Sequence, residues 1–155
     1  MKENTLQIGE FGPIYTQFEN KPKDAIKHLM KVKTGDCINA YHHEEIGWID
    51  IVWGENDPKT NKGFGLKHII EKHGEEIKQL GFDVPDFITI VLMYGEFKIA
   101  KPHTKRVLLE NKHFRIVISM FAYKSSTKMK KTFVLTAFDL RPIKKKPVSR
   151  KWPTG

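Results

Sequence analysis

The feature that most constrains the fold is the order of two sequence patterns along the chain. Helical periodicity dominates the first part, whereas short segments that alternate between apolar and polar positions dominate the last part. The predicted strands of that last part are residues 97–99, 106–109, 114–121 and 132–140. Helices followed by a run of strands favour an α+β fold, in which the N-terminal helices pack on one face of a C-terminal antiparallel β-meander.

Three helices are predicted from capping residues and apolar spacing. The first begins at about Pro22, which suits a first helical turn, and ends at Gly35. The second begins at about Leu66, and the third follows Asp83 as its N-cap and ends at Gly95. Two further extended segments, residues 37–41 and 48–53, lie between the first and second helices. The glycine- and asparagine-rich segment 54–65 is predicted to be a loop.

The chain has the length of a single domain, with 155 residues. We expect a leader or linker over residues 1–10, a folded domain over 11–140 and a basic tail over 141–155. Cys37 is the only cysteine, which favours a reducing compartment and excludes an internal disulfide framework. No apolar segment is long enough for a membrane span or has the form of a signal peptide. We therefore expect a protein that acts in the cytoplasm, or one delivered to a target-cell cytoplasm within a larger protein.

Positive charge is concentrated in the tail. The net charge of the chain is +9, from 27 Lys and Arg residues against 18 Asp and Glu residues. Six cations and no acid lie beyond residue 140, so 21 cations remain against the 18 anions elsewhere, a net charge of +3. A polyanion such as nucleic acid is one partner that this charge favours. A solvated linker is the alternative explanation.

Histidines are the best candidates for chemistry. His68 and His73 lie five residues apart in the segment GLKHIIEKHG, which turns them about 140° from each other around a helix. Zinc-binding histidines of the HExxH type lie four apart on one face, so this spacing argues against a metal. His73 falls on the apolar stripe of the helix and could simply be packed there. His68 falls on the opposite face, and we expect it to be an exposed histidine, either idle or catalytic.

The last two strands add polar side chains at alternating positions. Arg115 and Ser119 share a face of one strand, and Thr136 lies on the other, where alternation groups it with Val134 and Phe138. If the two strands pair, these three polar residues line one surface of the sheet. A solvated sheet face is the alternative.

Four segments, in order, resemble the phage and mobile-element nuclease domains of the barnase–EndoU–colicin–RelE superfamily. They are PIYTQFENKPKDAIKHLMK, IGWIDIVWG, GFGLKHIIEKHG and KTFVLTAFD. The resemblance is most specific to the barnase/colicin-type endoribonuclease domains of large polyvalent proteins, and it spans about residues 11–140. It implies a helix-then-meander fold, no cofactor and metal-free cleavage of RNA to a 2′,3′-cyclic phosphate. It also implies a toxin or mobile-element effector, for which tRNA is the first candidate substrate and a cognate immunity protein a candidate partner.

Carried onto this sequence, the resemblance assigns catalytic roles to four residues: His68, His73, Arg115 and Thr136. The histidines suit acid–base transfer near neutrality, the arginine suits a phosphate clamp, and the hydroxyl can donate a hydrogen bond. Arg106 rivals Arg115 as the phosphate cation. The candidate substrate-binding residues are Lys67, Lys72, Arg106, Ser119 and Lys131. The alternatives are a non-catalytic RNA- or protein-binding module and a DNA nuclease, which the absence of a metal site disfavours.

Overall fold

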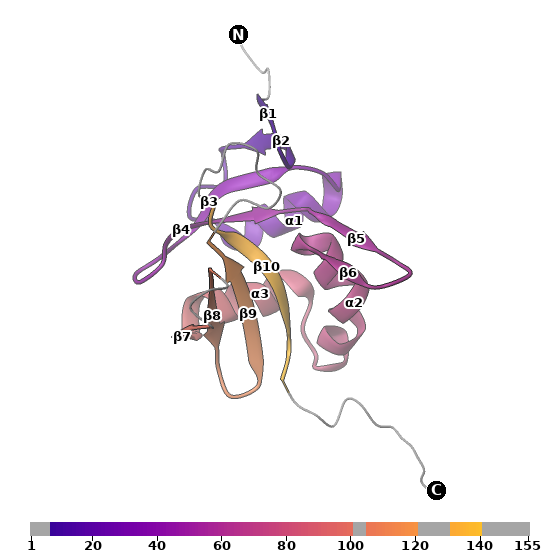
Figure 1. The fold of residues 1–155 in the computed structure, drawn as a ribbon, viewed down its shortest axis with the longest axis vertical. Coiled ribbons are helices and arrows are strands. Elements are labelled where there is room, and N and C mark those ends of the chain that lie inside the picture. The colour runs from indigo at the N-terminus through magenta and orange to yellow at the C-terminus, as the bar shows by residue number, and fades with distance from the viewer. Residues whose placement is uncertain (1–6, 101–104, 121–130, 141–155) are drawn as a thin grey trace, which may run out of the picture.

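The computed structural model describes residues 7–100, 105–120 and 131–140, and it contains three helices and ten strands in these segments. The helices are α1 (Pro22–Val32), α2 (Gly65–Gln79) and α3 (Val84–Tyr94). The strands are β1 (Gln7–Gly9), β2 (Gly12–Tyr15), β3 (Asp36–His43), β4 (Gly47–Val52), β5 (Glu55–Asp57), β6 (Lys62–Phe64), β7 (Glu96–Ile99), β8 (Arg106–Glu110), β9 (Phe114–Ser119) and β10 (Phe133–Asp139). In this described part of the chain, no helix has the length and apolar character that crossing a membrane requires. Figure 1 shows the arrangement.

Eight of the strands form one mixed sheet in the order β1-β2-β3-β4-β10-β9-β8-β7. Neighbouring strands are antiparallel except for two parallel pairs, β2 with β3 and β4 with β10. The fold is therefore α+β. It differs from the simple expectation of helices followed by strands, because β1 to β4 precede α2 and form half of the same sheet. Parallel pairing joins the two halves, and such long-range pairing leaves no local signal in the sequence.

The three helices lie close to their predicted positions. Asp83 caps α3 as expected, and its carboxylate accepts a hydrogen bond of 2.8 Å from the backbone N–H of Asp86. The first helix has Pro22 in its first turn but ends at Val32, before the predicted stop at Gly35. Lys33 adopts the left-handed conformation there (φ 57°), and its N–H bonds to the carbonyl of Leu29. The chain therefore leaves the helix earlier than the position of its glycine suggests.

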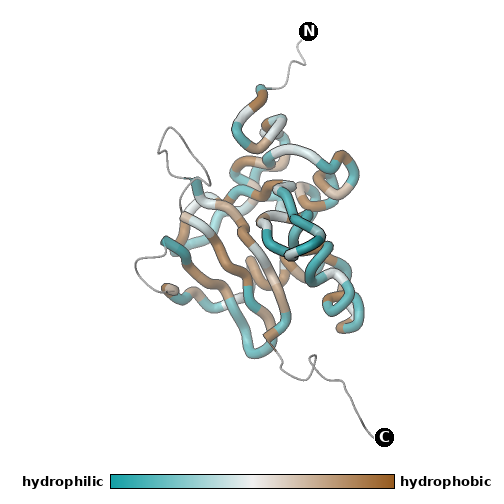
Figure 2. Tube along the Cα trace, turned by 45° about the vertical axis from the view of Figure 1, so that its right-hand side comes forward, coloured by the Kyte–Doolittle hydropathy of each residue, from teal (hydrophilic) through white to brown (hydrophobic). Residues whose placement is uncertain are grey.

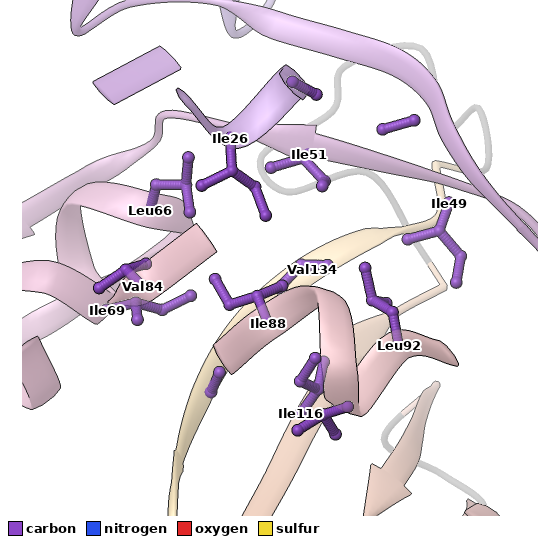
Figure 3. Packing of buried hydrophobic residues seen from close by; sticks show 14 of the residues in the cluster. Ile26, Ile49, Ile51, Leu66, Ile69, Val84, Ile88, Leu92, Ile116 and Val134 are labelled. Carbon is purple, nitrogen blue, oxygen red and sulfur yellow. The ribbon is translucent and has the colours of Figure 1, made fainter. Parts of the chain in front are cut away.

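The main core lies between α1, α2 and α3 and the inner face of the sheet. Figure 3 shows Ile88 and Leu92 of α3 close to Ile116 of β9 and Val134 of β10. All four side chains are fully or almost fully buried. Along the C-terminal strands, hydrophobic positions occupy the middle of each strand and hydrophilic ones the turn between β8 and β9 (Figure 2). Burial of these apolar side chains stabilises the fold and fixes one face of each strand toward the helices.

The segment predicted to be a loop contains a short hairpin, β5–β6, and this prediction was wrong. The glycines taken as loop signals allow the two strands to approach closely. A Cβ atom at Gly54 or Gly63 would overlap the facing backbone. The hairpin covers a second, smaller apolar cluster in which Phe64 packs against Phe133 of β10. The hairpin therefore partly covers the face of β10 that carries Phe133, which the alternating pattern would leave exposed to solvent.

A register shift changes which side chains of β10 face the core. Val134 lies opposite Ile118, but Thr136 lies opposite Val117, so Leu135 is an extra residue in the strand. Val134 packs in the main core, whereas Thr136 lies on the outer face, opposite Val117. Sequence alternation placed Val134 and Thr136 on one face, and this was wrong. Thr136 nevertheless shares the face of Arg115 and Ser119, because the bulge shifts the second half of the strand.

Candidate functional site

Helix α2 lies beside the second half of β10 (Figure 1). Strands β4 and β10 pair only at Asp50 and Phe133, at the beginning of β10. Farther along, the Glu76 side chain of α2 accepts a hydrogen bond of 3.0 Å from the backbone N–H of Asp139. The helix thus satisfies a backbone group at the end of β10, on the side that β9 does not occupy. This packing brings the histidines of α2 next to the polar positions of the strand.

His68 is buried, with 6% of its surface exposed, which corrects the expectation of an exposed histidine. Its Nδ1 atom lies 2.8 Å from the Oδ1 atom of Asn56 on β5. The position of His68 on the helix lies opposite the apolar stripe of α2, as the helical spacing indicates. The hairpin β5–β6 packs on that side of the helix and covers it. The expectation that His68 is exposed was wrong because this hairpin was not predicted from the sequence.

Asn56 connects His68 to a charged pair on the same helix. Its Nδ2 atom donates to Glu71 Oε1 at 3.0 Å and to Asn61 Oδ1 at 3.3 Å. Glu71 in turn forms an ion pair of 3.3 Å with Lys67, one turn earlier on α2. Neither Asn56 nor Glu71 was predicted as a site residue from the sequence. The i,i+4 spacing of Lys67 and Glu71 was visible, but the asparagine belongs to a segment read as a loop.

His73 lies next to His68 despite the angle between their positions on the helix. The ring centroids of the two histidines are 5.9 Å apart, with their planes at 80°. The ring of His73 stacks on Phe138 of β10, with centroids 5.4 Å apart and planes at 29°. Its Nδ1 atom lies 3.3 Å from Glu76 Oε1. His73 is thus held between a strand residue and a carboxylate, which the sequence assignment to an apolar stripe did not reveal.

Both histidines favour the neutral form. Burial lowers the pKa of His68, and positive charge on His73 and Lys72 lowers it further. Burial also lowers the pKa of His73, although the hydrogen bond and the charge of Glu76 oppose that shift. Of the two rings, His73 is the one with a carboxylate within hydrogen-bonding distance.

Thr136 lies on the outer face of β10, one position from Ala137, which is in the core. Its Oγ1 atom is buried and has no hydrogen-bond partner in the described part of the chain. A buried hydroxyl without a partner is unfavourable for stability, and a catalytic role is one explanation for such a group.

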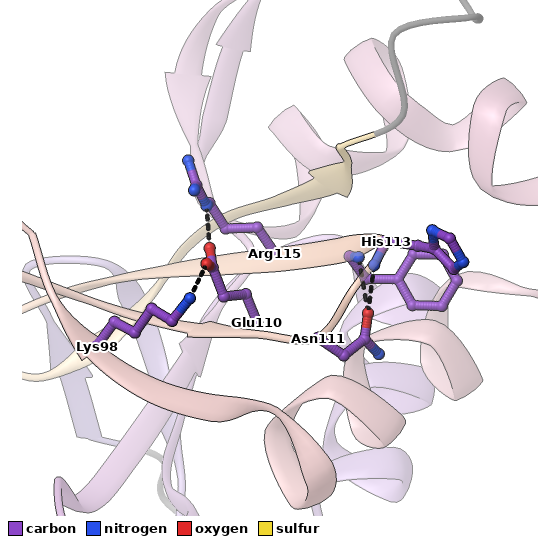
Figure 4. Close-up of polar contacts among 6 residues, drawn as sticks. Lys98, Glu110, Asn111, His113 and Arg115 are labelled. Carbon is purple, nitrogen blue, oxygen red and sulfur yellow. Dashed lines mark hydrogen bonds and ion pairs between the residues drawn. The ribbon is translucent and has the colours of Figure 1, made fainter.

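Arg115 lies opposite Phe138 in the sheet, and so adjoins the residue on which His73 stacks. Its Nε atom lies 2.6 Å from Glu110 Oε2, and the Lys98 ammonium lies 2.8 Å from the other oxygen of the same carboxylate (Figure 4). The hydrogen bond from Lys98 is the main reason that the pKa of Glu110 is lowered, and Arg115 contributes to it. Two cations therefore share one carboxylate.

The remaining predicted residues lie in three places. Arg106 is exposed on β8 and lies opposite Ser119, four positions along β9 from Arg115. Lys72 is exposed on α2 and Lys67 is paired with Glu71. Lys131 lies apart from the histidines, with its ammonium 2.7 Å from Asp36 and 2.6 Å from Asp50. The structure thus brings His68, His73, Thr136 and Arg115 around the second half of β10, and leaves Lys131 at the other end.

Two grooves of about 390 and 520 Å³ lie elsewhere on α2, and Met30 and Ile70 line both. Of the predicted site residues, only Lys67 lines either groove. In the residues that the structure describes, no three or more histidine, cysteine or acidic side chains gather in a group that could hold a metal ion. The candidate site therefore lies where α2 meets the outer face of the sheet, and of its predicted residues only Lys67 lines a groove.

Comparison with known proteins gives one match. A family model described as phage-Barnase-EndoU-ColicinE5/D-RelE like nuclease matches residues 40–143. This range contains all of α2 and the C-terminal strands, and thus every residue placed around β10 above. No curated protein and no solved structure matches the chain.

Proposed function

The chain belongs to the phage-Barnase-EndoU-ColicinE5/D-RelE like nuclease family, and from this premise we propose that it is a metal-independent endoribonuclease. In the proposed reaction the 2′-hydroxyl of RNA attacks the adjacent phosphorus and leaves a 2′,3′-cyclic phosphate. The observation that carries the proposal is the pair of imidazoles 5.9 Å apart, with His68 buried and His73 partly exposed, beside the sheet face with Thr136 and Arg115. Because RNA supplies its own nucleophile, the protein needs only to move protons and stabilise charge.

The two histidines supply the proton transfers in this proposal. One imidazole removes the proton of the 2′-hydroxyl, and the other protonates the departing 5′ oxygen. Their lowered pKa values keep a neutral base available at pH 7. General acids and bases positioned in this way typically accelerate a reaction by about 10²–10⁴-fold.

The second requirement is stabilisation of the negative charge that develops on the phosphorane. We assign its stabilisation to Arg115 rather than Arg106, because Arg115 lies opposite Phe138, on which His73 stacks. Glu110 holds the guanidinium through Nε at 2.6 Å, a contact that orients the group while its other nitrogens remain donors to phosphate. The hydroxyl of Thr136 contributes a further hydrogen bond to the substrate.

We propose that three cations and one hydroxyl bind the RNA beyond the reacting phosphate. They are Lys67, Lys72, Arg106 and Ser119, and the charged tail adds attraction to a polyanion. Lys131 is engaged by two carboxylates, so we assign it to the fold. A toxin or effector that cleaves tRNA and is inhibited by an immunity protein is the biological role that we propose for this activity.

The test is incubation of the purified protein with total RNA in EDTA, followed by mapping of the new ends. We expect cleavage in EDTA and 2′,3′-cyclic phosphate ends. Activity that disappears in EDTA and returns with Mg²⁺ would contradict the metal-free mechanism. Tight RNA binding without cleavage would instead support a non-catalytic binding module.

A further inference from the structure

The amide of Asn56 has only one favourable orientation. Its Nδ2 atom faces a carboxylate oxygen of Glu71 at 3.0 Å, and a carboxylate can only accept hydrogen bonds. Turning the amide by 180° would place Oδ1 against that oxygen, so two acceptors would meet. Glu71 remains ionised, because its hydrogen bonds with Asn56 and Lys67 lower its pKa. The oxygen of Asn56 must therefore be the atom that faces His68.

The orientation of Asn56 determines the position of the proton on His68. Since Asn56 Oδ1 lies 2.8 Å from Nδ1 of His68 and can only accept, Nδ1 must carry the hydrogen. The lone pair of the neutral ring is then on Nε2. We propose that Asn56, held by Glu71, is a positioning residue that fixes this tautomer and makes Nε2 of His68 the general base. This inference rests on the proposed ribonuclease function.

The surroundings of the two rings differ in a way that separates their roles. The charged or titratable groups that act on His68 are His73 and Lys72, and Glu71 reaches it only through the neutral amide of Asn56. His73 has the carboxylate of Glu76 at 3.3 Å, which stabilises an imidazolium. Of the two rings, His73 is therefore the one more readily protonated, and we assign it as the general acid.

The proposed step balances with these assignments. Nε2 of His68 takes the proton of the 2′-hydroxyl as O2′ bonds to phosphorus. The bond from phosphorus to O5′ breaks, and O5′ receives a proton from His73. His68 ends the step protonated and His73 neutral, so exchange with solvent restores both for the next turnover.

The direct test is nitrogen NMR of the histidine rings in the free protein. We expect His68 to show a protonated Nδ1 and an unprotonated Nε2 at neutral pH. Asn56→Ala should shift the ring toward the Nε2–H tautomer, which is the more common form of free histidine. A wild-type His68 with its proton on Nε2 overturns the inference, whatever the activity. Absence of any RNA cleavage by the wild type would overturn the proposed function, while the tautomer would still be measurable.

A kinetic test separates positioning from a structural role. Asn56→Ala should lower kcat on the order of 10²–10⁴-fold, the loss expected when a base presents the wrong tautomer, with little change in KM. Asn56→Asp combined with Glu71→Gln retains an acceptor for Nδ1–H and adds a negative charge without bringing two carboxylates together, so it should raise the pKa of His68 and move the acidic limb of the pH–rate profile to higher pH. Glu55→Gln, at the exposed neighbouring position of β5, is the matched control and should leave kcat and the profile unchanged.

Unfolding measurements on each variant identify losses of activity that come from loss of fold. If folded Asn56→Ala retains full kcat, or if the folded Asn56→Asp, Glu71→Gln double variant leaves the acidic limb where Glu71→Gln alone has it, the positioning role is wrong.

Discussion

Two polar clusters flank β10, one near each end, and they are built on opposite principles. Near the beginning of the strand, Lys131 lies between the carboxylates of Asp36 and Asp50, and all three side chains are largely buried. Near the other end, His68 and His73 contact Asn56, Phe138 and Glu76. The first cluster is formed by full charges, whereas the second is formed mainly by groups that can be neutral at pH 7.

The difference concerns how easily each cluster can change its protonation. Burial raises the pKa of Asp36 against the opposing effect of Lys131. Burial alone would lower the pKa of Lys131, but its two carboxylates outweigh that effect and raise it. Removing one charge there leaves another one buried without a partner. A histidine held by a neutral amide can gain or lose a proton at much lower cost, so only the second cluster suits catalysis.

The largest expected effect is on turnover at the histidine cluster. His68→Asn retains a side-chain N–H toward Asn56 but lacks Nε2, so it should lower kcat by about 10²–10⁴-fold. The free energy of unfolding should change by less than about 1.5 kcal/mol, because a hydrogen bond remains possible. Single-turnover cleavage assays and urea unfolding measure the two quantities. His42→Asn, at an exposed histidine of β3, is the control. Full activity in His68→Asn would show that the catalytic group lies elsewhere.

The charge cluster should show the opposite behaviour. Lys131→Met leaves Asp36 and Asp50 buried side by side, so we expect a loss of about 3–5 kcal/mol in the free energy of unfolding. Chemical denaturation measures this loss, with Lys62→Met at an exposed position of β6 as the control. A loss below about 1 kcal/mol would show that water reaches the carboxylates, and the contrast between the clusters would not hold.

The smallest expected effects are those of Thr136→Val, which should increase stability but decrease activity. Thr136→Val removes a buried hydroxyl that has no partner in the described residues, so it should stabilise the fold by about 1 kcal/mol. The same change removes the hydrogen bond that we propose between this hydroxyl and the substrate, so it should lower kcat by about 10-fold. Thermal unfolding and cleavage assays measure the pair. Destabilisation by Thr136→Val would mean that the hydroxyl serves the fold.

Local patterns predicted the helices and the first and last residues of most strands well. Asp83 and the apolar spacing placed α3, and the segment around His68 and His73 placed α2. The family resemblance is confirmed by the match over residues 40–143. These features depend on residues close together in the sequence, for which periodicity and capping are informative.

The geometry of the candidate site depended on contacts that local patterns do not encode. Asn56 reaches His68 across twelve residues, through a hairpin whose glycines indicated a loop. The pairing of β4 with β10 joins segments more than 80 residues apart. The surroundings of both histidines, and so their burial, follow from these two contacts. For that reason the sequence could nominate His68 but not its partner.

Because of the bulge at Leu135, the positions of β10 that face the core are offset by one residue between the first and second halves of the strand. Before the extra residue Val134 packs in the core, and after it Ala137 does, although an odd number of steps separates them. The position of Thr136 is therefore set by a count of residues as much as by their identity. Aligning related chains on hydrophobic alternation alone would place this threonine on the wrong side of the sheet. A single inserted or deleted residue in this strand would exchange the hydroxyl on the outer face for a core methyl, with no change in composition elsewhere.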